Sequence, residues 1–115
     1  MNTGLTPSKM ADHYDFVPFC GSKVSMIQHG GQFFTPVKPI IENLGMDWSA
    51  QFKKLKDNAA DWGVTELTVS SDGGPQQMLC MPIRNICKLL LTISPNKVRP
   101  DMQEALAAYQ AKYNQ

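Results

Sequence analysis

The segment WSAQFKKLKDNA, residues 48–59, carries the clearest periodic pattern in this sequence. Apolar residues recur along it at spacings of four, three and four, and a tryptophan follows: Trp48, Phe52, Leu55, Ala59 and Trp62. Residues at these spacings share one face of an α-helix, so the segment predicts an amphipathic helix whose apolar stripe packs inward. Asp47 stands where an N-cap side chain accepts backbone N–H groups, and Asn58 and Gly63 are candidate ends.

A shorter helix is predicted directly upstream. One helical face gathers Val37, Ile40, Ile41 and Leu44. Pro39 falls in the first turn, where its missing N–H is tolerated, and Gly45 lies where a glycine ends a helix. The short break between the two helices is compatible with a helix-turn-helix unit, in which the second helix offers its outer face to the DNA major groove.

In the rest of the chain, strand patterns and helix patterns occupy separate blocks. Extended segments are predicted at residues 16–20, 23–28, 33–35, 64–69 and 76–81. Two further helices are predicted, one with Ile83, Ile86, Cys87 and Leu90 on one side and the last from about Pro100 to Tyr113. Because the two patterns are segregated, the fold class is α+β: a small antiparallel β-sheet with hairpins and about four helices, including the helix-turn-helix-like pair.

Length and composition indicate one domain. The chain has 115 residues, which is too short for a TIM barrel. Hydrophobic residues make up 43% of it, which is enough for one packed core. Residues 1–15 are polar and aperiodic and are predicted to be a mobile leader, with the domain at 16–115. The odd count of three cysteines favours a reducing cytoplasm. No apolar run approaches the ~20 residues of a membrane helix, so no membrane partner is expected.

No constellation for catalysis or metal binding stands out. The glycine pair after Asp72 is not followed by the Lys-Ser/Thr sequence and the helix that a phosphate loop requires. We therefore interpret it as a hairpin turn. His13 and His29 are far apart in the sequence, and Cys80 and Cys87 are expected to be buried. We therefore expect no enzyme activity, no catalytic or metal-binding residues, no cofactor and no small-molecule substrate.

The charge pattern leaves two interpretations open. Eleven Lys and Arg against ten Asp and Glu give a net charge of +1, which is not typical of an unaided nucleic-acid binder but allows a local basic face. Lysines suit phosphate contacts, and Gln51 could pair with adenine. Asp57 and Asp61 dilute the field, so an ordinary solvated helix face explains the same residues. Candidate contacts for a nucleic acid or another partner are Lys38, Ser49, Gln51, Lys53, Lys54, Lys56, Lys97 and Arg99.

Several stretches together resemble the N-terminal domain of phage antirepressor proteins, which is related in pattern to the BRO-N domain of viral and phage regulators. The matching stretches are VPF at 17–19, PVKPIIENLGMDW at 36–48, QFKKL at 51–55, WGV at 62–64, MLCMPIR at 78–84, ISPNKVRP at 93–100 and YQ at 109–110. The likeness spans about residues 16–110, and it adds Arg84 to the candidate contacts.

The resemblance implies a prophage regulator acting in the cytoplasm of a bacterial host. Antirepressors inactivate a phage repressor, commonly by direct contact, and so permit expression of lytic genes. The expected partner is therefore a phage repressor protein; the alternative is direct binding of double-stranded DNA through the basic helix at 48–58. Family members often carry a second domain after this one, whereas this chain ends soon after the last family helix. Self-association through the stripe between Met102 and Tyr113 is a further expectation, although that stripe can equally pack on its own sheet.

Overall fold

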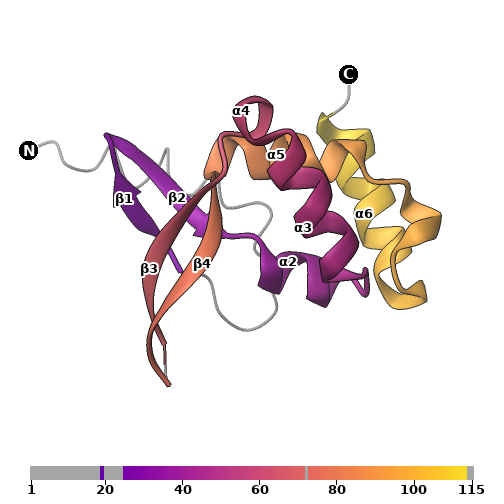
Figure 1. Cartoon of the computed structure of the whole chain (residues 1–115). Helices are drawn as coiled ribbons and strands as arrows, with labels where there is room; N and C mark the ends of the chain where they lie inside the picture. The colour runs from indigo at the N-terminus through magenta and orange to yellow at the C-terminus, as the bar shows by residue number, and fades with distance from the viewer. Residues whose placement is uncertain (1–18, 20–24, 72, 114–115) are drawn as a thin grey trace, which may run out of the picture.

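The computed structural model describes residues 19, 25–71 and 73–113, and these residues form an α+β fold. In Figure 1 the strands lie on one side of the molecule and the helices gather on the other. The strands are β1 (Ile27–His29), β2 (Gln32–Pro36), β3 (Thr65–Ser71) and β4 (Gly74–Pro82). The helices are α2 (Lys38–Asn43), α3 (Trp48–Asp57), α4 (Ala59–Trp62), α5 (Ile83–Thr92), the 3-10 turn η2 (Pro95–Lys97) and α6 (Pro100–Tyr113).

The four strands form one antiparallel sheet in the order β1-β2-β4-β3. Gly30 and Gly31 join β1 to β2 with φ angles of +57° and +79°, which is the backbone of a type I′ turn that matches strand twist. The β3–β4 hairpin has the longest pairing, from Thr65 opposite Cys80 to Ser71 opposite Gly74. Its tip projects away from the helices (Figure 1). The predicted strands at 64–69 and 76–81 are therefore confirmed, and each is longer than the pattern indicated.

The start of the chain differs from the prediction where the structure describes it. Phe19 was assigned to a strand, but it has a 3-10 conformation. Its ring is buried and meets the Tyr109 ring edge-on at a centroid distance of 5.6 Å, so Phe19 packs against α6 as part of the core. Of the strand predicted at 23–28, residues 25 and 26 are not in a strand, and β1 begins at Ile27, which pairs with Phe34 of β2. Residues 23 and 24 lie outside the described part of the chain. The predicted leader at 1–15 and the other residues of 16–20 lie outside the described residues.

The helix ends follow the capping residues in the sequence. The carboxylate of Asp47 accepts a hydrogen bond from the backbone N–H of Ala50 at 2.9 Å, which satisfies a free donor in the first turn of α3. Asn58 and Gly63 both end helices: α3 stops at Asp57, and α4 stops before Gly63 in the left-handed conformation, φ +67°. The predicted four helices are present, and the break at Asn58 adds the single turn α4.

The main core lies between the sheet and the helices. Its fully buried side chains come from α2, α3, α5 and α6 and from β4, and they include Ile40, Ile41, Leu44, Leu55, Met81, Ile86, Leu90 and Leu106. A second, smaller cluster gathers Phe34, Val69 and Cys80. Of the predicted stripe on α3 and α4, only Leu55 is fully buried, while Trp48, Phe52 and Trp62 are partly exposed. These three rings pack against the main core, so the predicted inward-facing stripe is confirmed, and its aromatic members are covered only in part.

Candidate interaction surface around helix α3

Helix α3 turns Leu55 into the core and presents its polar residues to solvent. Lys53 and Lys54 are exposed, and neither ammonium group has an ion pair or hydrogen bond with the described part of the chain. Asp57 is also exposed, four residues after Lys53 and three after Lys54, so it neighbours both on the helix surface. Its carboxylate interrupts the positive strip that these two lysines would otherwise form.

Lys56 does not contribute a free cation. Its Nζ lies 5.7 Å from the centroid of the Phe52 ring and 3.9 Å from Oε2 of Glu66 on β3. Both partners of this ion pair are about half exposed, so the pair stabilises the fold by about 1 kcal/mol at most. The ion pair compensates the negative charge of Glu66 on β3.

The remaining α3 candidates are less uniform. Ser49 is exposed in the first turn, and Gln51 is half-buried. The exposed carboxylate of Asp47 stands at the same end of the helix, where a DNA-reading helix normally meets bases and phosphates. The start of α3 is therefore anionic and its second half is cationic.

The segment before α6 lies against the turn between α2 and α3. The backbone N–H of Arg99 donates to the carbonyl of Leu44 at 2.8 Å. Gly45 has φ +82°, and a Cβ added there would lie 2.8 Å from Cβ of Arg99, so only glycine fits. The structure thus brings Arg99 to the α2–α3 turn, where its side chain pairs with Asp101 at 2.9 Å. Lys97 is exposed two residues earlier on η2.

Arg84 has a separate environment. It is exposed at the start of α5 and donates through Nη2 to Oε1 of Gln32 at 3.2 Å. That contact connects α5 to the beginning of β2 and does not involve α3. This hydrogen bond therefore ties Arg84 to β2 and not to the candidates on α3.

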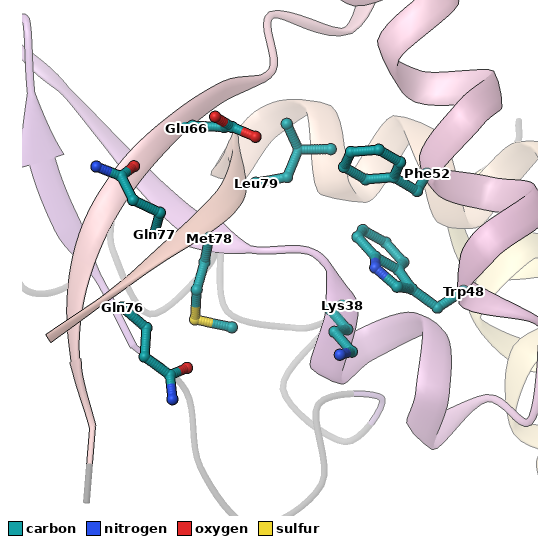
Figure 2. A pocket seen from close by; sticks show the side chains of 8 residues that line it. All are labelled: Lys38, Trp48, Phe52, Glu66, Gln76, Gln77, Met78 and Leu79. Carbon is teal, nitrogen blue, oxygen red and sulfur yellow. The ribbon is translucent and has the colours of Figure 1, made fainter. Parts of the chain in front are cut away.

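A hollow of about 200 Å³ opens between α3 and the β3–β4 hairpin. Figure 2 shows the side chains that line it: Lys38, Trp48, Phe52, Glu66, Gln76, Gln77, Met78 and Leu79. The two aromatic rings form one wall, 5.7 Å apart between centroids with an interplanar angle of 59°. Small-molecule sites typically enclose roughly 300–1,000 Å³, so this hollow fits a side chain better than a free metabolite.

Of the lining residues, only Lys38 was predicted as a contact. The sequence placed Trp48 and Phe52 in the core and treated residues 76–81 only as a strand. The sequence does carry a signal for this hollow. Gln76 and Gln77 are polar, whereas a strand packed tightly over the aromatic pair would be apolar at these positions.

The described residues offer no group of three or more His, Cys, Asp or Glu side chains placed to hold a metal ion. Burial raises the pKa of the Cys80 thiol to about 11, so this thiol is protonated at neutral pH and is a poor nucleophile. Cys80 packs with Phe34 and Val69, which assigns it a role in the core. Within the described part of the chain, no helix is long and apolar enough to cross a membrane.

Comparison with known proteins identifies the relationship that the sequence indicated. The family model of the P22_AR N-terminal domain matches residues 15–115. Searches of curated proteins and of solved structures found no match. Since the family model covers nearly the whole chain, this protein belongs to the P22_AR N-terminal domain family, a family of phage antirepressor N-terminal domains.

Proposed function

We propose that this protein is an antirepressor-type regulator: it binds a phage repressor protein in the cytoplasm of the bacterial host and so relieves repression of lytic genes. It acts by occupying its partner and not by catalysis. The observation that carries the proposal is the pair of partly buried aromatic rings, Trp48 and Phe52, that line the hollow between α3 and the β3–β4 hairpin. Family membership supplies the regulatory setting.

Aromatic side chains at the edge of a hollow suit a protein interface. Tryptophan is enriched among the residues that dominate binding energy, and these residues sit in pockets surrounded by polar groups. Here the same hollow is also lined by the amides of Gln76 and Gln77, the ammonium of Lys38 and the carboxylate of Glu66, beside the apolar Met78 and Leu79. Burying the exposed part of both rings against a partner supplies the hydrophobic contribution that an interface needs.

Direct DNA binding is the second candidate, because Lys53 and Lys54 are exposed and without a partner group. Three features favour the protein partner: the net charge is only +1, Asp57 lies one helical turn from both lysines, and Asp47 places a carboxylate at the start of α3. A helix that reads the major groove contacts bases with its N-terminal residues, and here that end would repel phosphates.

One experiment separates the candidates. The purified protein is titrated against purified phage repressors and against duplex DNA at several salt concentrations, and a lytic-promoter reporter is measured in the host. We expect repressor binding with a shallow salt dependence and a rise in reporter output. DNA binding that falls steeply with salt, as counterion release requires, and that is lost in a Lys53→Ala, Lys54→Ala double variant would contradict the proposal.

A further inference from the structure

Strand β4 has a partner on both sides along only part of its length. β2 pairs with it at three positions, from Phe34 opposite Pro82 to Pro36 opposite Cys80. The backbone N–H of Val37 then donates to the carbonyl of Leu79 at 3.1 Å, and the chain turns into α2. From Leu79 to Gly74, β4 pairs with β3 alone among the described strands.

The backbone groups on this open edge follow from the alternation of an antiparallel ladder. Because the Leu79 carbonyl points to Val37, it points away from β3, so Leu79 is a non-hydrogen-bonded position of the β3–β4 pair. Gln77 and Pro75, two and four residues earlier, have the same orientation. Pro75 is tolerated there because a proline nitrogen at an outward position removes no rung. The N–H and C=O of Gln77 therefore face the open edge without a partner in the described structure.

The open edge lies beside the hollow. Gln76, Gln77, Met78 and Leu79 belong to both, and Trp48 and Phe52 stand opposite them on α3 (Figure 2). A strand added to β4 in line with β2 would run between the hairpin and α3. Since successive side chains of a strand point to opposite faces, one of its side chains would enter the hollow and meet the aromatic pair.

Charge defines the chemistry of that strand. Lys38, at the start of α2, lines the hollow and has no ion pair or hydrogen bond with another described residue. Glu66, the acidic group of the same lining, is compensated by Lys56 at 3.9 Å. The site therefore presents one unmatched positive charge next to an apolar wall, which complements a carboxylate next to an apolar side chain.

We propose that the open edge of β4 is a docking site for an extended protein segment that carries a large apolar side chain beside an Asp or Glu. The segment adds a strand to β4 through the backbone of Gln77, buries its apolar side chain against Trp48 and Phe52, and places its carboxylate near Lys38. This mode is β-strand addition, in which the main chain gives affinity and the pocket gives specificity. That the segment belongs to the repressor rests on the function proposed above.

The first test selects ligands from a displayed library of random twelve-residue peptides, using the full-length protein. We expect selected peptides to share an aromatic or large aliphatic residue near Asp or Glu. A Lys38→Glu variant should bind them about tenfold or more weakly, since like charges oppose each other, and should select Lys or Arg instead. Lys53→Glu, the same charge change at an exposed position of α3 outside the lining, is the matched control and should keep the original preference.

The second test addresses the backbone. Gln77→Pro removes the outward N–H without removing a rung to β3, whereas Gln77→Ala removes only the side chain. Proline should abolish peptide binding and alanine should preserve it, with circular dichroism and thermal melting showing that both variants fold. If the proline variant does not fold, the peptide amides can be methylated one at a time instead. Because only every second N–H of an added strand points to β4, methylation should abolish binding at alternate positions along the peptide.

The outcomes separate this inference from the proposed function. Failure to select any peptide, an unchanged charge preference in Lys38→Glu, or methylation effects without alternation would overturn the docking site. So would a dimer of the wild-type protein that Gln77→Pro dissociates, because the occupant would then be a second copy. Repressor binding that survives Lys38→Glu and Gln77→Pro would refute the inference and leave the proposed function standing. Peptide binding without binding of any repressor would refute the proposed function and leave the docking site.

Discussion

The two halves of helix α3 differ in what covers their apolar side chains. Leu55, in the second half, is fully buried in the main core. Phe52 and Trp48, about one and two turns earlier on the same stripe, line an open hollow. The periodicity of the sequence fixes the direction in which all three point, but the neighbouring element decides whether that direction is core or surface. The first half of α3 faces a hairpin segment of mixed polarity, Glu66 and Gln76 to Leu79, which covers its rings only in part.

The largest expected effect is a loss of stability on truncating the buried residue in the second half of α3. Leu55→Ala should lower the free energy of unfolding by about 2–5 kcal/mol, as for other fully buried leucines that leave a cavity. Chemical denaturation followed by circular dichroism measures it. A loss below about 1 kcal/mol would mean that the second half of α3 is not part of the core.

Trp48→Ala should affect partner binding more than stability, the opposite of the effect expected for Leu55→Ala. Because the ring lines the hollow and is only partly buried, we expect its removal to weaken partner affinity by about 2 kcal/mol, as for a binding hot spot, and to lower stability less than Leu55→Ala does. Trp62→Ala is the control, since Trp62 is also partly buried but does not line the hollow. Calorimetric titration with the repressor that binds the wild type measures both variants. Equal affinity losses in the two would contradict a binding role for the first half of α3.

Asp47→Ala should act on the start of α3 alone. It removes the acceptor of the Ala50 N–H and should cost about 1 kcal/mol of stability, the usual value of an N-cap. Asp47→Asn, which keeps an acceptor, should recover most of that loss in thermal melting. The two variants showing the same melting temperature would indicate that the hydrogen bond does not stabilise the first turn.

The smallest effect is expected at the ion pair beside the hollow. Lys56→Gln should change stability by less than about 1 kcal/mol, because the 3.9 Å contact with Glu66 is half-exposed. It should, however, leave Glu66 uncompensated and weaken binding of the acidic peptides selected above. Peptide affinity unchanged at low salt would show that the Glu66 charge does not reach the docking segment.

Local chemistry made much of the fold predictable. Asp47, Asn58 and Gly63 marked the helix ends because each satisfies or permits a specific backbone state. Contacts between distant segments were not predictable in this way. Arg84 bonds Gln32, 52 residues earlier, and Phe19 packs on Tyr109 of the last helix. Neither relation leaves a periodic trace in the sequence.

The candidate site was less predictable than the fold for the same reason. The lysines of α3 are visible as a charge run, but the position of Asp57 one turn from Lys53 and Lys54 and the pairing of Lys56 with Glu66 depend on helix geometry and on the hairpin. The hollow depends on where β2 leaves β4, which is a property of the assembled sheet. The sequence therefore predicted the helix that carries the candidate site, but not the face with Trp48 and Phe52 that lines the hollow.

Pro75 has a consequence for how the hairpin assembles. Shifting β4 by one residue against β3 would bring the proline nitrogen to a rung position, where it cannot donate, and would turn Leu79 out of the core. Both penalties oppose misaligned hairpins during folding. Every correctly folded molecule therefore displays the same backbone groups, in the same phase, to an incoming chain.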